Sequence, residues 1–108
     1  MAGSERIVVQ RDVIRGERDR KPLWQCRLHE IVRIEAYKRN QVAVDLICFD
    51  IAFECDGEQW MATVHEDLPG WENLIAACRL LADFDREWFA KVSLPPFAEC
   101  RTVVYERL

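Results

Sequence analysis

Three residues in the middle of the chain, Cys48, Asp50 and His65, have side chains that could perform covalent chemistry together. A histidine beside a thiol can withdraw its proton, and a carboxylate can orient that histidine, which together produce a thiolate nucleophile. This chemistry requires the three side chains to share one face of one structural element. The sequence predicts such an element, because Asp56-Gly57 is a favoured two-residue turn between antiparallel strands.

The Asp56-Gly57 turn determines which residues face each other in this hairpin. Counting outward from the turn, the apolar face pairs Phe53 with Trp60, Ile51 with Ala62 and Phe49 with Val64. The opposite face pairs Glu54 with Gln59, Ala52 with Met61, Asp50 with Thr63 and Cys48 with His65. Since alternate residues of a strand share a face, Asp50 is expected near the Cys48–His65 pair.

The polar face of the hairpin permits a second kind of chemistry. Glu54 adds a carboxylate to Cys48, Asp50 and His65, and such a set could bind a soft or borderline metal. Only two soft ligands converge there, so the sequence predicts neither a metal site nor a cofactor. No nucleophile elbow or Gly-rich oxyanion loop accompanies the thiol. The first expectation is therefore a polar outer sheet face, and thiol catalysis stays an alternative.

The segment HEDLPGWENL, residues 65–74, joins the hairpin to a predicted helix. Asp67 stands where a carboxylate can accept hydrogen bonds from a first helical turn, and Pro69 suits that turn. Apolar residues spaced by three and four predict one long helix: Trp71, Leu74, Ile75, Cys78, Leu81 and Ala82. Periodicity places both Trp60 and Trp71 in the core.

The remaining segments complete an α+β domain. Before the hairpin, we expect an edge strand over 7–14 and a charged loop over 16–22. Residues 24–37 are expected to form one long strand, or two strands with a break near residue 30. Asp85 is expected to cap a short helix over 86–92, and residues 100–107 to form a last strand. The sequence thus predicts an antiparallel sheet of four to five strands, one long and one short helix packed on it, and a C-terminal strand that returns to the sheet.

The alternation of apolar residues changes phase in the strand before the Asp56-Gly57 turn. A three-residue turn, Arg39–Gln41, is expected to set Ala36 opposite Val44. Val44 and Leu46 then point to one face, whereas Ile47 and the alternate residues after it point to the other. Either a bulge near residue 47 reconciles the two sets, or the sheet is covered on different faces at its two ends. The second case leaves apolar area for a partner or a second copy of the chain.

Basic and aromatic residues of the 24–37 strand suggest another function. Arg27, Arg33 and Tyr37 share a predicted face, where basic groups could track phosphate and an aromatic ring could stack on a base. Glu35 lies on the same face and opposes that attraction. The pattern falls short of a nucleic-acid signature, so a solvated strand face is expected and binding of single-stranded nucleic acid stays an alternative.

The segment 88–97 is apolar and carries one charge. Trp88 and Phe89 are adjacent, so at most one of them can point fully inward from a short helix. Either this segment is pinned on the core, or Trp88, Phe89, Pro96 and Phe97 form an exposed edge where aromatic side chains supply contact energy. It is the interaction site that the sequence favours most.

Charge is unevenly distributed along the 108 residues, whose formal net charge is −4. Residues 1–41 hold ten Lys or Arg against six Asp or Glu, whereas residues 42–108 hold five against thirteen. The negative total disfavours a polyanionic partner. The first expectation is that the uneven distribution is a chance division over a solvated surface. The alternative is a basic face and an acidic face that suit an oriented contact with a partner or a head-to-tail homodimer.

Cysteine spacing and hydropathy indicate the compartment. Five cysteines without CxxC spacing argue against a disulfide framework, so free thiols in the cytoplasm are expected. No stretch approaches the length that crosses a bilayer, and no signal peptide is apparent. We therefore expect one domain over residues 1–108, frayed over 1–6, that binds a protein partner or a second copy and is not an enzyme.

Overall fold

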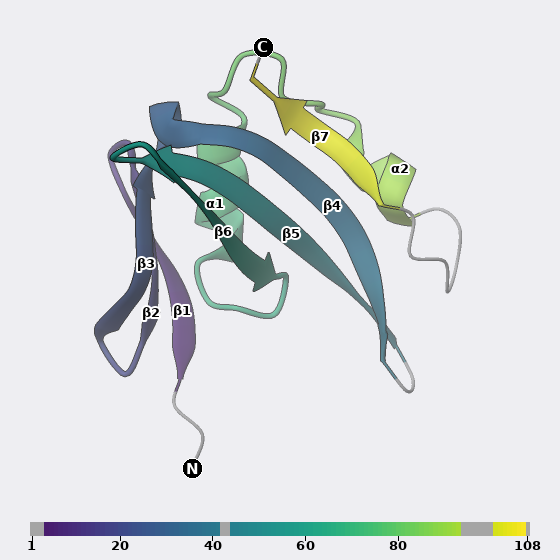
Figure 1. The fold of residues 1–108 in the computed structure, drawn as a ribbon. Helices are drawn as coiled ribbons and strands as arrows, with labels where there is room; N and C mark the ends of the chain where they lie inside the picture. Colours follow the sequence, from purple (N-terminus) through teal and green to yellow (C-terminus); the bar gives the residue numbers. More distant parts are fainter. Residues whose placement is uncertain (1–3, 42–43, 94–100, 108) are drawn as a thin grey trace.

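The structure, a computed structural model, describes residues 4–41, 44–93 and 101–107, which form two antiparallel sheets and two short α-helices (Figure 1). The elements follow in this order: β1 Glu5–Gln10, β2 Val13–Arg18, β3 Lys21–Arg27, the 3-10 helix η1 Leu28–Glu30, β4 Ile31–Gln41, β5 Val44–Cys55, β6 Glu58–His65, α1 Trp71–Cys78, α2 Trp88–Ser93 and β7 Thr102–Glu106. One sheet has the strand order β1-β2-β3 and the other β6-β5-β4-β7. The predicted α+β class with antiparallel strands is confirmed.

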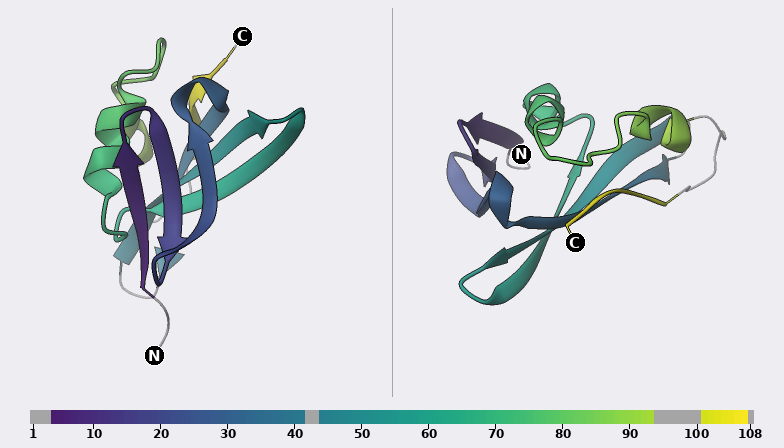
Figure 2. Two further views of the ribbon diagram at one scale, coloured as in Figure 1. Left: turned by 90° about the vertical axis from the view of Figure 1, so that its left-hand side faces the viewer. Right: turned by 90° about the horizontal axis from the view of Figure 1, so that it is seen from above.

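The three-stranded sheet and both helices lie against one face of the four-stranded sheet, and the core lies between them (Figure 2). α1 packs on β1, and α2 packs on β4 and β7. Buried apolar residues of both sheets and both helices form one cluster, so the described chain is a single domain. Its fully buried members include Ile14, Ile31, Ile34, Phe49, Ile51, Val64, Leu74, Val92 and Val104.

Three local predictions are confirmed. The cross-strand partners of β5 and β6 are those that the Asp56-Gly57 turn predicts, from Phe53 with Trp60 to Cys48 with His65. The break expected in the preceding long strand is η1, which separates β3 and β4 into different sheets. β7 pairs with β4, so the C-terminal strand returns to the sheet.

The N-terminal part of the chain differs from the prediction. Instead of one strand over 7–14 and a loop over 16–22, the chain forms the meander β1–β2–β3. Its turns contain no glycine, and Arg11, Asp19 and Arg20 take left-handed conformations with φ of 56°, 53° and 67°. Charged residues signal such turns only weakly. The sequence therefore predicts four to five strands in one sheet, but the described residues form seven strands in two sheets.

Glu17 is the residue that allows this charged stretch to be a strand. It is buried, and its carboxylate accepts hydrogen bonds from Arg6 at 2.9 Å and from Arg15 at 2.7 Å. The bond from Arg6 is the main cause that holds the pKa of Glu17 below its usual value. Strand pairing thus brings Arg6 to Glu17, whereas Arg15 lies two residues before it on β2 itself. β1 begins at Glu5, inside the stretch where fraying is expected.

The first helix is shorter than its apolar stripe predicts. α1 ends at Cys78, and the N–H groups of Leu80 and Leu81 then donate to carbonyls three residues earlier, which tightens the chain. Asp83 takes a left-handed conformation with φ of 65°, which an α-helix cannot include. Phe84 is nevertheless buried in the core. The apolar spacing therefore continues through a turn instead of a helix.

The expected cap of α1 is also wrong. Gly70, not Asp67, is the N-cap, and its φ is 93°. A Cβ atom at Gly70 would lie 1.9 Å from the carbonyl oxygen of Ile7. The N–H of Ile7 donates to the carbonyl of Pro69 at 2.7 Å. Close packing of this loop on β1 therefore selects glycine before the helix.

The second helix begins at Trp88, two residues later than expected. The Asp85 carboxylate accepts a hydrogen bond from the backbone N–H of Glu87 at 2.9 Å and pairs with Lys91 at 2.5 Å. The contact with Lys91 is the main cause that lowers the pKa of Asp85. Asp85 thus holds the start of this segment, as expected of a capping residue.

The register between β4 and β5 differs from the expected one. β4 continues to Gln41, which pairs with Val44, so the strand includes the residues expected to turn. Ala36 lies opposite Phe49, not opposite Val44, and Ile34 lies opposite Ile51. The observed register joins the buried residues of β4 to the apolar face of the β5–β6 hairpin. Burial of a continuous face is the physical reason for it.

The phase change near residue 47 is not a bulge. Tyr37 and Lys38 pair in step with Cys48 and Ile47, without a shift in register. Tyr37, Leu46 and Cys48 instead form a second, small buried cluster, separate from the main core. At this end the sheet is therefore buried on both faces, because Ile47 and Phe49 belong to the main core, and this is neither a bulge nor a switch of the covered face.

Candidate functional site

Cys48 and His65 lie across from each other as predicted, but their surroundings do not favour a nucleophile. Cys48 is fully buried, and burial raises the pKa of its thiol. The thiol lies 3.6 Å from the carbonyl oxygen of Leu46. The His65 Nδ1 atom accepts a hydrogen bond from the backbone N–H of Asp67 at 3.3 Å. A desolvated thiol of this kind holds its proton.

Asp50, the third residue of the expected group, is bound by other partners. Its carboxylate accepts hydrogen bonds from the hydroxyl groups of Tyr37 at 2.9 Å and Thr63 at 2.8 Å. Arg101 pairs with the same carboxylate at 3.1 Å, and its guanidinium carbon lies 4.0 Å from the centre of the Tyr37 ring. Burial, with a smaller effect of Asp50, raises the pKa of Tyr37. This network joins three strands of the sheet to the residue before β7.

Glu54, the further carboxylate of the metal hypothesis, lies near the hairpin turn, 3.7 Å from Arg107. Within the described part of the chain, no three side chains of the kinds that bind metals gather at one point. The fold thus places Glu54 away from the Cys48–His65 pair.

The basic strand face is divided and largely paired with carboxylates. Arg27 lies in β3 and Arg33 in β4, which belong to different sheets. Arg33 pairs with Glu35 at 3.1 Å and with Glu106 at 3.2 Å. Tyr37, expected to stack on a base, is buried. These contacts remove most of the features that single-stranded nucleic acid would use.

The segment expected as an apolar recognition edge is only partly described, because Pro96 and Phe97 lie outside the described residues. Trp88 is buried, and its ring centre lies 4.9 Å from that of Phe49. Phe89 points outward and is 55% exposed. As adjacency predicts, one of the two aromatic residues points inward and the other does not.

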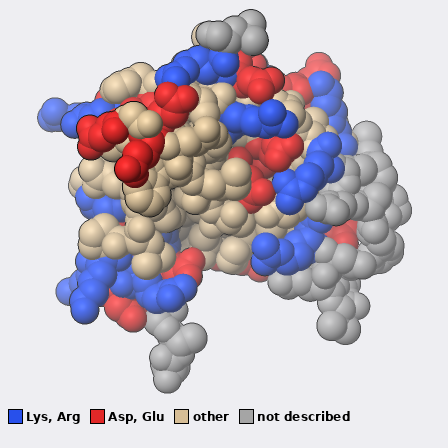
Figure 3. All heavy atoms as spheres, viewed as in Figure 1, with Lys and Arg blue, Asp and Glu red and all other residues tan. Residues whose placement is uncertain are grey.

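A groove between β3 and the β5–β6 hairpin collects exposed apolar side chains. Leu23 is 50% exposed and Trp60 53%. The groove has a volume of about 450 Å³, and its apolar lining is Leu23, Trp24, Phe53, Cys55 and Trp60. A broad uncharged surface covers this region in the left half of Figure 3. A groove lined by exposed apolar side chains is a candidate interaction site.

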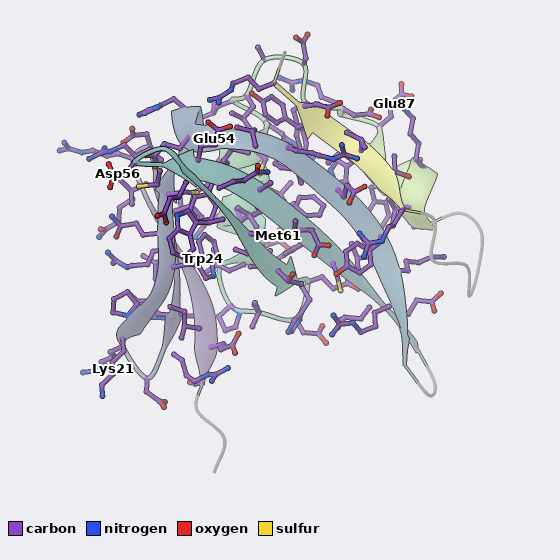
Figure 4. All side chains as sticks on the ribbon, in the orientation of Figure 1. Lys21, Trp24, Glu54, Asp56, Met61 and Glu87 are labelled. Carbon is purple, nitrogen blue, oxygen red and sulfur yellow. The ribbon has the colours of Figure 1, made fainter. Side chains whose placement is uncertain are left out.

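Trp24 connects the two sheets inside the groove. Its indole covers Gly16, its partner on β2, where an added Cβ would lie 2.1 Å from the indole Nε1. The Trp24 ring centre is 6.2 Å from that of Phe53. Figure 4 shows Trp24 between β3 and β6. Because Gly16 has no side chain, the Trp24 indole can pack directly on the β2 backbone and form this wall of the groove.

The two ends of the groove differ in charge. Asp56 and Glu58 are exposed carboxylates at the hairpin turn, and Glu54 lies beside them. Lys21 lies at the opposite end of β3 (Figure 4). Across the described ranges, neither Asp56 nor Glu58 forms an ion pair with a basic side chain. The groove is thus apolar along its length and acidic at the hairpin turn.

Sequence patterns did not predict this groove. Trp60 is expected in the core because it pairs with Phe53, but only Phe53 is buried. The tip of the hairpin projects away from the helices (Figure 2). Ala62 and Val64, farther from the turn, are buried. The one available signal is the position of Trp60 near a hairpin turn, where a strand can extend past the core.

No known protein family, curated protein or solved structure matches this chain. Among the described residues, no helix has the length and apolar character needed to cross a membrane. Function is therefore argued from the groove itself.

Proposed function

We propose that this chain is a small protein-binding domain and that the groove between β3 and the β5–β6 hairpin is its recognition surface. The observation that carries the proposal is the exposure of Leu23 and Trp60 around the half-buried Trp24. Covering such side chains removes apolar surface from water, which is favourable. Tryptophan is also among the residues that contribute most binding energy at protein interfaces.

The proposed partner is a polypeptide, either a different protein or a second copy of this chain. The proposal includes no catalytic step and no cofactor. It includes the expected cytoplasmic location, which suits the free thiols of Cys26, Cys48, Cys55 and Cys78.

The two alternative functions have weaker support. A thiol enzyme would need an accessible Cys48 thiolate, whereas this thiol is buried and its pKa is raised. A nucleic-acid binder would need free basic groups, whereas Arg33 is paired with two carboxylates. Neither alternative has an observation in its favour comparable to the exposed groove.

A displayed library of random peptides tests the proposal. The library is selected in parallel on the wild-type protein, on Trp60→Ser and on Leu80→Ser. Leu80 is the matched control, because it is 76% exposed and does not line the groove. Circular dichroism and thermal unfolding confirm that each variant is folded before selection.

The wild type and Leu80→Ser are expected to enrich the same peptides. Trp60→Ser is expected to bind them about 30-fold more weakly, because loss of a central aromatic residue costs about 2 kcal/mol or more. Failure of the wild type to enrich any peptide would contradict the proposal. Equal enrichment on Trp60→Ser would contradict it too, since the binding surface would then lie elsewhere.

A further inference from the structure

The acidic end of the groove indicates the charge of its occupant. Asp56 and Glu58 are exposed beside the aromatic lining, and neither is paired with a basic side chain among the residues described. Glu54 is only loosely engaged, with 3.7 Å between its carboxylate and Arg107. Carboxylates at the rim of an interface attract a partner of opposite charge and repel one of like charge. The partner is therefore expected to carry a positive charge at this end.

The aromatic lining suits the side chains that carry such a charge. Trp24, Phe53 and Trp60 line the groove next to the two carboxylates. Lysine and arginine have long apolar stems that pack on apolar surface while the charged group stays in water. Their charged groups are also attracted to aromatic faces, most of all to tryptophan. A lysine or arginine can thus satisfy the acidic rim and the aromatic wall together.

The edge of β6 indicates the conformation of the occupant. β6 is the edge strand nearest to β3, and β5 is its only partner in the described sheet (Figure 1). Cys55 and Glu58 flank the two-residue turn and form a hydrogen-bonded pair. In an antiparallel hairpin every second cross-strand pair, counted outward from the turn, is joined in this way, so Trp60 and Ala62 also bond to β5. The backbone groups of Gln59, Met61 and Thr63 therefore point away from β5.

This edge lacks the residues that ordinarily protect an edge strand. The segment Glu58–His65 contains no lysine, arginine or proline, the residues that discourage pairing with another chain. An extended polypeptide can therefore pair with β6 and place alternate side chains toward the groove.

We propose that the groove binds an extended segment of a partner protein whose groove-facing side chains, at every second position, include both apolar residues and lysine or arginine. This inference rests on the proposed protein-binding function and adds the chemistry of the ligand. The apolar residues pack against Trp24 and Trp60, and the basic residues lie near Asp56 and Glu58. The segment pairs through its backbone with β6.

Three fluorescein-labelled, end-blocked decapeptides test this chemistry by fluorescence anisotropy. In all three, every second residue is serine; the other five positions hold three leucines and two lysines in the first peptide (leucine–lysine), three leucines and two glutamates in the second (leucine–glutamate), and three serines and two lysines in the third (serine–lysine). Each is titrated with the wild type, with Asp56→Asn/Glu58→Gln, and with Glu72→Gln/Glu87→Gln. The last variant is the matched control, since it removes the same charge at exposed carboxylates that do not line the groove: Glu72 lies in α1, and Glu87 lies far from the hairpin turn (Figure 4).

The leucine–lysine peptide is expected to bind the wild type about tenfold more tightly than either other peptide. The Asp56→Asn/Glu58→Gln variant should lose about tenfold in affinity, as two rim ion pairs would give, and the control should lose none. Added salt should weaken binding of the leucine–lysine peptide by about tenfold for the wild type and for the control. It should weaken binding to Asp56→Asn/Glu58→Gln by less, because the ion pairs are already absent there.

Equal or tighter binding of the leucine–glutamate peptide would overturn the basic-segment proposal, and equal binding of the serine–lysine peptide would overturn its apolar half. Unchanged affinity in Asp56→Asn/Glu58→Gln would overturn it as well. In these cases, peptides from the random library that bind the wild type but not Trp60→Ser would still support the proposed protein-binding function. Failure of the basic-segment proposal can therefore be told apart from failure of the proposed function. A dimer in light scattering that Trp60→Ser dissociates would identify a second copy as the occupant and also overturn the proposal.

Discussion

Replacing Gly16 with alanine tests how the groove is built. Gly16 lies in the middle of β2 and pairs with Trp24. Glycine weakens a strand, so a change to alanine at an open position stabilises a protein by about 0.4–1 kcal/mol. Here the new Cβ would lie 2.1, 2.5 and 2.9 Å from three atoms of the Trp24 indole, closer than atoms can approach. The ring must therefore move away from the Gly16 backbone.

The cost of this displacement exceeds the gain in strand preference. Overpacking of a buried contact costs about 1–3 kcal/mol, which leaves a net destabilisation of about 1–2 kcal/mol for Gly16→Ala. For a domain of this size, 1 kcal/mol changes Tm by about 4–8 °C, so Tm should fall by about 5–15 °C. Peptide binding should weaken too, because Trp24 lines the groove.

A double-mutant cycle followed by thermal unfolding separates the clash from other effects. With Trp24→Ala already present, Gly16→Ala should cost nothing or stabilise slightly, because the indole is gone. The two substitutions should therefore be strongly non-additive. A rise in Tm for Gly16→Ala alone, or an equal fall in Tm with and without Trp24, would refute the packing described here.

Three further perturbations test loop packing, electrostatics and thiol access. Gly70→Ala should destabilise the protein by about 2 kcal/mol or more, because its Cβ would lie 1.9 Å from the Ile7 carbonyl oxygen at a left-handed position; an unchanged urea midpoint would contradict this. The folded-state pKa of Glu17 lies below its usual 4.5, so the stability that its carboxylate contributes is complete above pH 4.5 and is lost as pH falls through the lower folded value. In a plot of urea midpoint against pH, Glu17→Gln should therefore be flatter than the wild type in this acidic range. Curves for wild type and variant that run parallel through this range would exclude the effect. Iodoacetamide at neutral pH should alkylate the half-exposed Cys55 before the fully buried Cys48, as read by peptide mass spectrometry; the reverse order would revive the thiol-enzyme hypothesis.

Local signals in the sequence account for the parts of the fold that were predicted. Asp56-Gly57 defines a turn with left-handed φ of 53° and 77°, and the alternation around it determines every pair of the β5–β6 hairpin. Trp88 and Phe89 also divide between core and solvent as their adjacency requires. These features depend on residues a few positions apart, where backbone geometry decides the outcome.

The features that were missed depend on contacts between distant segments. Glu17 can lie inside a strand partly because the pairing of β1 with β2 brings Arg6 to its carboxylate, beside Arg15 of its own strand. The register of β4 follows from the joint burial of residues on three strands, which no single turn determines. The groove needs Trp24 on one sheet to meet Phe53 on the other. The periodicity of one strand does not indicate contacts between separate sheets. It also does not show where a strand extends past the core, so it placed Trp60 in the core.

The most direct test of the proposed groove is the affinity of the peptide most enriched on the wild-type protein, measured by fluorescence anisotropy. It is compared for the wild type, Trp60→Ser and Leu80→Ser at one salt concentration. The expected result is about 30-fold weaker binding for Trp60→Ser and unchanged binding for Leu80→Ser. Equal affinity for all three proteins would show that the groove between β3 and the β5–β6 hairpin is not the recognition surface.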